Sequence, residues 1–124
     1  MKILVVDDEL DVQTLFEQKF RKDIKQQTME FVFAHSGTEA LHYLSKHNHE
    51  AVLILSDINM PGMTGLELLS KIKAMYKTPP PVVMMITAYG DPEMKSSAEQ
   101  LGADDFLTKP LDFTLLREKL QTLN

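Results

Sequence analysis

The stretch Val52-Leu53-Ile54-Leu55-Ser56-Asp57 sets four aliphatic residues directly before two polar ones. A continuous apolar run of this length predicts a strand that is covered on both faces, as in the parallel sheets of α/β proteins. Four further short apolar runs lie at residues 3–6, 31–34, 82–86 and 106–107. Together with residues 52–55 they predict five strands, of which the last is the shortest.

Segments of helical period separate these runs. Asp91 followed by Pro92 predicts the start of the fourth helix, and Gly102 predicts its end. Strands that alternate with helices predict a doubly wound α/β fold with a parallel sheet. The apolar residues that recur at helical spacing are Val12, Leu15, Phe16 and Phe20; Ala40, Leu41 and Leu44; Leu66, Leu69 and Ile72; Met94, Ala98 and Leu101; and Leu116, Leu120 and Leu123.

Size and composition bound the function. A chain of 124 residues, 44% apolar and 25% charged, fits one ordinary globular domain, and we expect a single domain over residues 1–124. The absence of cysteine excludes disulfides and thiolate metal sites and favours a reducing compartment. The first apolar run is too short for a signal segment or a membrane span. The formal charge of −5 disfavours nucleic-acid binding. From these three observations together we expect a cytoplasmic domain that binds neither membrane nor nucleic acid.

Reactive polar residues follow four of the predicted strands. Asp7-Asp8-Glu9 follow the first strand, Ser56-Asp57 the third, Thr87 the fourth and Thr108-Lys109-Pro110 the fifth. Ligands of doubly wound sheets bind beyond the carboxyl ends of the strands, so these groups should meet at one edge. Taken singly, each has a structural interpretation as a helix cap, a loop acid, a turn hydroxyl or a surface lysine. Together they form a defined chemical set.

The chemistry of this set limits its function. Two carboxylates about 4 Å apart repel by roughly 4 kcal/mol at an effective dielectric near 20, so Asp7, Asp8 and Asp57 favour a bound cation. Oxygen ligands select Mg²⁺ or Mn²⁺. A metal alone would not explain Lys109 and Thr87, which supply groups that stabilise charge on a transferring phosphoryl group. We therefore predict that Asp57 is a nucleophile that accepts a phosphoryl group.

These residues lie in four ordered motifs that resemble the receiver domains of response regulators in two-component signalling. The resemblance covers essentially the whole chain and implies a CheY-like, flavodoxin-like sandwich with strand order 2-1-3-4-5 and five helices. The motifs are Ile3-Leu4-Val5-Val6-Asp7-Asp8-Glu9, Leu55-Ser56-Asp57-Ile58-Asn59-Met60-Pro61-Gly62-Met63-Thr64-Gly65, Ile86-Thr87-Ala88-Tyr89 and Gly102-Ala103-Asp104-Asp105-Phe106-Leu107-Thr108-Lys109-Pro110.

The resemblance implies that Asp57 takes its phosphoryl group from a phosphohistidine on a sensor histidine kinase or a phosphotransfer protein. Asp8 and Asp57 would bind Mg²⁺ directly. Asp7 would act largely through a bound water, and Asn59 would complete the metal shell with its main-chain carbonyl.

The resemblance also implies a switch. Lys109 would pair with Asp57 and then with its phosphate, and the peptide bond before Pro110 would be cis. The Thr87 hydroxyl would move to the phosphoryl group, and the Phe106 ring would turn inward into the vacated space. This would change the surface of the fourth helix, fifth strand and fifth helix, which controls an output domain or a partner protein.

Some positions depart from common patterns of the family or adjust the site. Phe106 stands where tyrosine is frequent, so its switch would depend on packing alone. Asn59 and Tyr89 occupy positions that tune the access of water to the acyl phosphate, and the small Ala88 leaves room for the phosphoryl group. Leu115 stands where one transcription-factor subfamily has a glutamate used in dimer pairing. That pairing is therefore in doubt, while a phosphorylation-dependent homodimer stays open.

Three other classes of protein fit these residues less well than a receiver does. Aspartate-nucleophile phosphatases usually need a second acid at the position of Asn59 and a cap over the substrate, and the chain has neither. A flavodoxin-like nucleotide binder needs a Gly/Ser/Thr loop where Asp7-Asp8-Glu9 would repel phosphate. A protein-binding module without phosphorylation would not need the complete site. We therefore expect no enzyme beyond catalysis of its own phosphorylation and dephosphorylation.

The histidines do not indicate a metal site. Three of the four, His42, His47 and His49, lie within eight positions in a polar helix end and loop, without a carboxylate at ligand spacing. We therefore interpret all four, His35 included, as surface residues.

Overall fold

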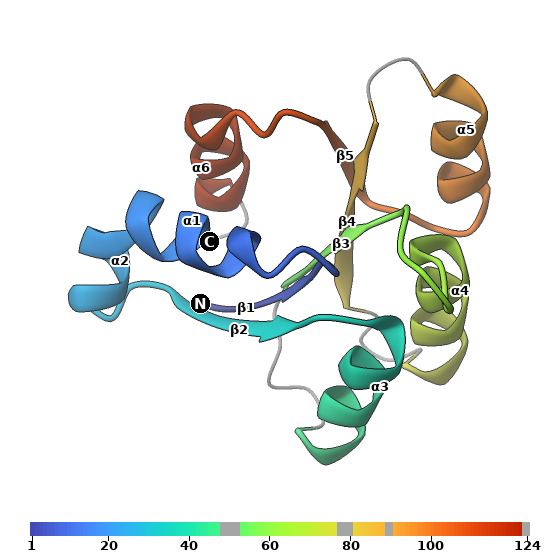
Figure 1. Ribbon diagram of the computed structural model, residues 1–124, viewed down its shortest axis with the longest axis horizontal. Helices are drawn as coiled ribbons and strands as arrows, with labels where there is room; N and C mark the ends of the chain where they lie inside the picture. The colour runs from blue at the N-terminus through green and yellow to red at the C-terminus, as the bar shows by residue number, and fades with distance from the viewer. Residues whose placement is uncertain (48–52, 77–80, 89–90, 123–124) are drawn as a thin grey trace.

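The strands form one parallel sheet. The computed structural model describes residues 1–47, 53–76, 81–88 and 91–122. Its five strands lie in the order β2-β1-β3-β4-β5, which confirms the predicted doubly wound sheet and its order (Figure 1). Their bounds are Lys2–Val6 for β1, Glu30–Ala34 for β2, Leu53–Asp57 for β3, Val82–Thr87 for β4 and Asp105–Thr108 for β5.

The described residues form six helices, so the expectation of five was wrong. The first predicted helical segment is broken at Phe20, which leaves helical geometry (φ −111°, ψ 24°) and separates α1 from the short α2. The Phe20 side chain is fully buried, which anchors this break to the core. None of the described helices is long and apolar enough to cross a membrane. The helices are α1 (Asp11–Lys19), α2 (Arg21–Lys25), α3 (Gly37–Lys46), α4 (Gly65–Met75), α5 (Pro92–Gln100) and α6 (Phe113–Gln121).

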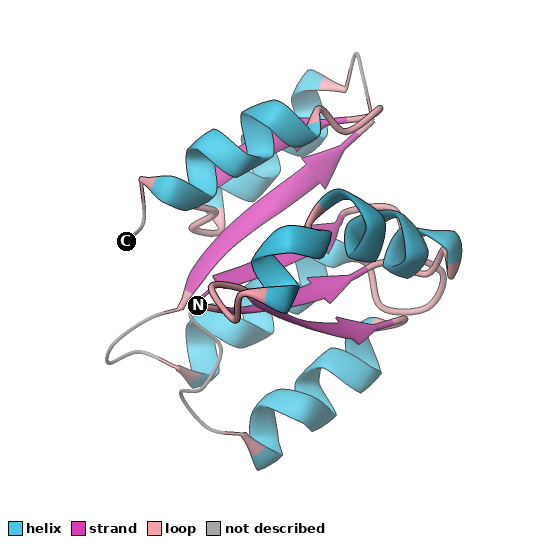
Figure 2. Ribbon diagram, turned by 90° about the vertical axis from the view of Figure 1, so that its left-hand side faces the viewer, coloured by secondary structure: helices cyan, strands magenta, loops and turns pink. Residues whose placement is uncertain are grey.

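Two apolar cores lie on opposite faces of the sheet, because successive strand side chains point to alternate faces. Figures 1 and 2 show the strands between two groups of helices, with α1 and α6 on one side and α3, α4 and α5 on the other. The strand residues toward α1 and α6 are Ile3, Val5, Leu53, Leu55, Met84 and Ile86, and those toward α3, α4 and α5 include Leu4, Val6, Ile54, Val83 and Met85.

The helix boundaries follow local sequence signals. Asp91 accepts a hydrogen bond from Met94 N at 3.2 Å and Pro92 begins α5, as predicted. Gly102 lies just beyond the end of α5 with φ +101°, a conformation that favours glycine. The predicted buried stripes were too wide, because Leu15 and Leu101 are 39% and 38% exposed. Leu123, the last residue of the final predicted stripe, lies outside the described residues, as does Val52.

All five strands extend at least one residue beyond the predicted runs, and for β3 and β4 the added residues belong to the site. β3 ends at Asp57 and β4 at Thr87, so both polar residues belong to strands and are buried. Val6 pairs with Ser56, Asp57 with Ile86, and Thr87 with Thr108. The residues that end or follow β1, β3, β4 and β5 therefore lie side by side at one edge.

Candidate functional site

Three carboxylates converge at this edge. The side chains of Asp7, Asp8 and Asp57 place oxygen atoms within 4.8 Å of one another. Asp7 follows β1, and Asp57 ends the neighbouring β3. Asp7 and Asp57 are only 4% and 1% exposed, whereas Asp8 lies at the surface. The cluster is therefore open to solvent on the side of Asp8.

Backbone N–H groups orient the two buried carboxylates. Asp7 Oδ1 accepts a hydrogen bond from Glu9 N at 2.9 Å, and Asp57 Oδ1 accepts one from Asn59 N at 3.2 Å. Each donor lies two residues beyond its acid, in the turn that follows the strand. Both carboxylates keep further oxygen lone pairs for other partners.

Lys109 reaches the same cluster from the fifth strand. Its Nζ lies 2.8 Å from Asp57 Oδ2, and its backbone N donates to Thr87 O at 2.9 Å. Burial alone would lower the pKa of Lys109. The hydrogen bond and charge of Asp57, together with the charges of Asp7 and Glu9, outweigh burial and raise the pKa. Lys109 is therefore a cation at neutral pH.

Burial and the neighbouring acids Asp57 and Glu9 disfavour a negative charge on Asp7. Burial raises its pKa, and the charges of Asp57 and Glu9 add to this rise, against the Glu9 N–H and Lys109, which lower it. A cation bound between the carboxylates would remove this penalty. The donor set contains oxygen atoms only, which suits a hard ion such as Mg²⁺ or Mn²⁺.

The Asp7→Asn variant should be more stable than the wild type when metal is absent. Because the folded state raises the pKa of Asp7, it holds the proton more tightly than the unfolded state. The tighter binding of this proton stabilises the folded state at low pH, and the stabilisation is lost as the pH rises through the raised pKa of Asp7. At pH 7 the variant should gain about 1 kcal/mol in the free energy of unfolding measured with urea.

The same substitution should lose this advantage at low pH. The gain should shrink toward pH ~4, near the ordinary pKa of an aspartate. Asp11→Asn, which removes an exposed charge from the first turn of α1, should change stability by less than about 0.5 kcal/mol. A destabilised Asp7→Asn, or a gain independent of pH, would contradict the assigned electrostatics.

Thr87 and Phe106 lie on one face of the sheet. Phe106 pairs with Met85, and Thr87 pairs with Thr108, so both side chains face the core that carries Met85. Thr87 is 3% exposed. Phe106 is half-buried, and Lys95 Nζ of α5 lies 5.3 Å from the centroid of its ring.

The other predicted site residues are placed less centrally. Asn59, two residues after Asp57, and Ala88, directly after Thr87, are both exposed. The Lys109–Pro110 peptide bond is cis, as the resemblance implied. Tyr89 lies outside the described residues.

Sequence reasoning missed two neighbours of the site. Gly65 begins α4 so close to β3 that a Cβ on it would lie 2.1 Å from Asp57 O. Of the histidines predicted to be surface residues, His42 is exposed, His35 and His47 are half-buried, and His49 lies outside the described residues. His35 Nδ1 lies 3.2 Å from Asp7 O. The strand order could have placed His35, because the residue after β2 must lie near the residue after β1. No spacing signal indicated the contact of Gly65.

Known proteins of one family match this chain. The family model described as the response regulator receiver domain matches residues 3–121. Response regulator RppA of Synechocystis is 34% identical over 99% of this chain and 50% of that protein. A cyclic di-GMP phosphodiesterase of Thermotoga maritima is 33% identical over 97% of the chain and 30% of that protein. The chain thus spans half or less of these two relatives.

Other matches are of similar length to this chain. Sporulation initiation phosphotransferase F of Bacillus subtilis is 32% identical over 97% of this chain and 90% of that protein. Among solved structures, a response regulator receiver domain protein from Clostridium thermocellum has a TM-score of 0.85 at 28% identity, covering 98% of this chain and 92% of its own. Chemotaxis protein CheY4 of Vibrio cholerae has a TM-score of 0.83 at 28% identity, covering 99% and 98%.

Proposed function

The chain belongs to the response regulator receiver family of two-component signalling, and from this premise we propose that Asp57 accepts a phosphoryl group in a Mg²⁺-dependent switch. The observation that carries the proposal is the 2.8 Å contact between Lys109 Nζ and Asp57 Oδ2 inside a cluster of three acids. A buried carboxylate, a paired cation and a set of oxygen atoms that could hold a metal ion meet there. Phosphoryl transfer to a carboxylate needs each of these parts.

The donor in this proposal is a phosphohistidine on a sensor histidine kinase or a phosphotransfer protein. A carboxylate oxygen of Asp57 forms the new bond to phosphorus, the P–N bond to the histidine breaks, and the imidazole leaves with the bonding electron pair. Asp57 is almost covered, so the Lys109 ammonium must shift as the phosphoryl group arrives. It then pairs with the phosphoryl oxygens and keeps an anionic partner.

Asp8 and Asp57 would hold Mg²⁺ or Mn²⁺ directly, Asp7 through a water and Asn59 through its main-chain carbonyl. The ion would supply positive charge that offsets the charge of the phosphoryl group. Asp7 also orients the turn after β1 through the hydrogen bond from Glu9 N. Asn59 and Tyr89 would adjust the access of water to the acyl phosphate, and the small Ala88 would leave room for the phosphoryl group.

The proposal is tested by intact-mass measurement with a small acyl-phosphate donor. The wild type should gain the mass of one phosphoryl group when Mg²⁺ is present and should remain unmodified when EDTA removes the metal. Modification that proceeds equally in EDTA would rule out the metal-dependent mechanism. An unmodified protein with this donor and with several phosphohistidine donors would rule out the function.

The Lys109→Gln variant should be phosphorylated at a rate reduced by about 10²-fold. The amide keeps a hydrogen-bond donor near Asp57 but removes the positive charge that stabilises the transferring group. Initial rates of adduct formation under excess donor measure the effect. Lys71→Gln, which neutralises an exposed lysine of α4, is the matched control and should react at the wild-type rate. Equal rates for both variants would remove Lys109 from the mechanism.

Thr87 and Phe106 are proposed to report the phosphorylation to the surface of α5, β5 and α6. Their shared face supports this coupling, since movement of the Thr87 hydroxyl toward the phosphoryl group would leave space toward the side that Phe106 occupies. Phe106 has no hydroxyl, so its two positions would differ in packing alone. The surface of α5, β5 and α6 would then engage an output domain or a partner protein.

The Thr87→Ala variant should accept the phosphoryl group and yet fail to switch. Phosphorylation of the wild type should shift the NMR signals of α5, β5 and α6. In the variant these shifts should fall to less than about half, because alanine has no hydroxyl that can move toward the phosphoryl group. Thr87→Ser keeps the hydroxyl and should restore the shifts. Full shifts in Thr87→Ala would show that the signal takes another route.

In this proposal residues 1–124 form one receiver domain, whose only catalysis is its own phosphorylation and dephosphorylation. The lack of cysteine suits the cytoplasm as its site of action. Phosphorylation-dependent pairing of two copies is compatible with the same surface.

A further inference from the structure

The outer edge of β2 presents unpaired backbone groups. β2 pairs with β1, and no described strand lies on its other side. Glu30 N donates to Met1 O at 2.8 Å, and Asp7 N donates to Ala34 O at 3.0 Å, so the backbone groups of Glu30 and Ala34 face β1. These groups alternate in direction along a parallel strand. The N–H and C=O groups of Phe31 and Phe33 therefore point outward.

The opposite edge of the sheet is better protected. β5 has only four residues, and its first residue, Asp105, is bound by Lys119 Nζ of α6 at 2.7 Å. Lys109 and Pro110 follow β5 directly. Short length, charge and proline are common means of preventing an edge strand from pairing. β2 has Phe31, Val32 and Phe33 at its centre and no proline, and its one charged residue, Glu30, stands at its first position.

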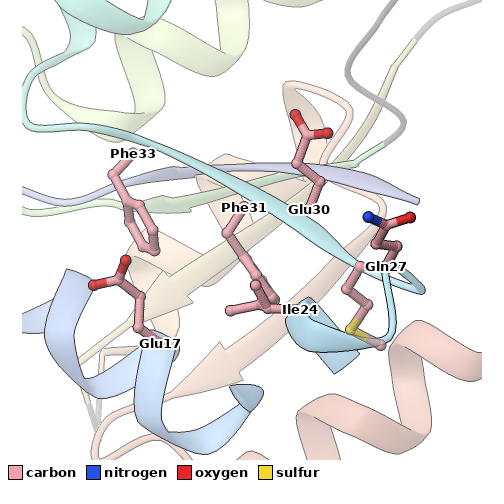
Figure 3. A pocket seen from close by; sticks show the side chains of 7 residues that line it. Glu17, Ile24, Gln27, Glu30, Phe31 and Phe33 are labelled. Atoms are coloured by element: carbon pink, nitrogen blue, oxygen red, sulfur yellow. The ribbon is translucent and has the colours of Figure 1, made fainter. Parts of the chain in front are cut away.

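A hollow of about 390 Å³ lies beside this edge, on the face of α1 and α2. Figure 3 shows Phe31, Phe33 and Ile24 gathered on one side of β2, with the Glu17 carboxylate beside them. Ile24 is 37% exposed and so offers an apolar contact to an incoming side chain. Among the described residues that line this hollow, Glu17 brings a carboxylate and no lysine or arginine is present, whereas the Glu30 carboxylate points away from Ile24 and lies 3.4 Å from Lys2 Nζ (Figure 3).

A second hollow, of about 520 Å³, borders β2 and is lined by α3. Phe33 and Ala34 contribute to it from β2, and Thr38, His42 and Tyr43 contribute from α3. Since α3 covers the opposite face of the sheet from α1, the hollows lie on opposite sides of the β2 edge (Figure 1). An extended chain paired with β2 would direct alternate side chains to the two faces, and so into both hollows.

We propose that the β2 edge binds an extended segment of a partner protein as an added strand. Its outward hydrogen-bonding groups are those of Phe31 and Phe33, and an apolar side chain of the segment occupies the hollow at Ile24. Basic residues of the segment lie beside Glu17, because its carboxylate lies at the hollow and the chain carries a net charge of −5. The same net charge disfavours a second copy as the occupant.

The probe is a synthetic peptide of about eight residues in which lysine alternates with valine, compared with one in which glutamate replaces lysine. Hydrogen exchange at the Phe31 and Phe33 amides should slow about tenfold or more in the presence of the lysine peptide, because these N–H groups become hydrogen-bonded. The glutamate peptide should leave their exchange unchanged. The wild-type protein without phosphoryl donor is used, so the result does not depend on the function proposed for Asp57.

Substitutions at the hollow locate the peptide. Ile24→Lys should weaken binding about tenfold, by placing charge and bulk at the apolar contact, and Glu17→Lys should weaken it about threefold. Two substitutions away from the hollow serve as controls: Met75→Lys in α4 replaces an exposed apolar residue by lysine, and Glu99→Lys in α5 reverses an exposed charge. Both should alter affinity less than about twofold. Circular dichroism on all four variants confirms that they are folded.

Four results of the peptide experiments would overturn the proposal. These are no binding of the lysine peptide at millimolar concentration, equal affinity for the two peptides, protection of amides elsewhere than Phe31 and Phe33, and equal effects of Ile24→Lys and Met75→Lys. Concentration-dependent dimerisation that protects Phe31 and Phe33 without peptide would assign the edge to a second copy and would also overturn it.

Discussion

The Asp57→Asn variant should lose phosphorylation, with a rate at least about 10³-fold below that of the wild type in Mg²⁺ and a small acyl-phosphate donor. A neutral amide oxygen is too poor a nucleophile to form the bond to phosphorus. The side chain keeps its size, which matters because Asp57 is 1% exposed, and its Oδ1 still accepts the hydrogen bond from Asn59 N. Time courses of intact mass measure the rate.

The matched control for this variant is Asp112→Asn. Asp112 is exposed and caps α6 by accepting hydrogen bonds from Thr114 N and Leu115 N, and asparagine caps helices about as well. This control should be modified at the wild-type rate. If Asp57→Asn were labelled as fast as the control, Asp57 would not be the acceptor.

The Gly65→Ala variant should unfold far more readily, losing about 3 kcal/mol or more of folding free energy. A Cβ at this position would lie 2.1 Å from Asp57 O and 2.7 Å from Ile58 Cα. Both are backbone atoms, so no side-chain rotation relieves the clash, and α4 must move away from β3. Urea denaturation followed by circular dichroism measures the loss.

Gly62→Ala provides the contrast for this prediction. Gly62 has φ +73°, but a Cβ there would meet no atom within 4 Å. Its cost should be the backbone strain alone, about 1 kcal/mol. If Gly65→Ala were no more destabilising than Gly62→Ala, the close packing of α4 against the end of β3 would be incorrect.

Much of the fold could be predicted from the sequence, because it depends on the order and spacing of apolar residues. The apolar runs at residues 3–6 and 82–86 alternate with helical segments, and that alternation determines the parallel sheet. The break at Phe20 did not follow, because Phe20 continues the apolar spacing of α1 and is buried like the rest of that stripe, while its backbone leaves helical geometry. The exposure of Leu15 was missed for a related reason, since spacing does not give the width of the buried stripe.

Part of the candidate site could likewise be predicted from the sequence, and part could not. Asp7, Asp8, Asp57 and Lys109 could be brought together from sequence, because each ends or follows a strand and parallel strands end at one edge. The hydrogen bonds from Glu9 N and Asn59 N depend on turn conformation, which the residue types do not specify. The contact of Gly65 with Asp57 O depends on the distance between two elements, and pattern contains no such distance.

The central claim is that Asp57 carries the phosphoryl group, and the most direct test is to identify the modified residue. Borohydride reduces an aspartyl phosphate to homoserine, so peptide mapping of the phosphorylated, reduced protein reports the position. We predict conversion at position 57 alone, dependent on Mg²⁺. Conversion at Asp8, or a phosphohistidine at His35, with Asp57 unmodified would contradict the account.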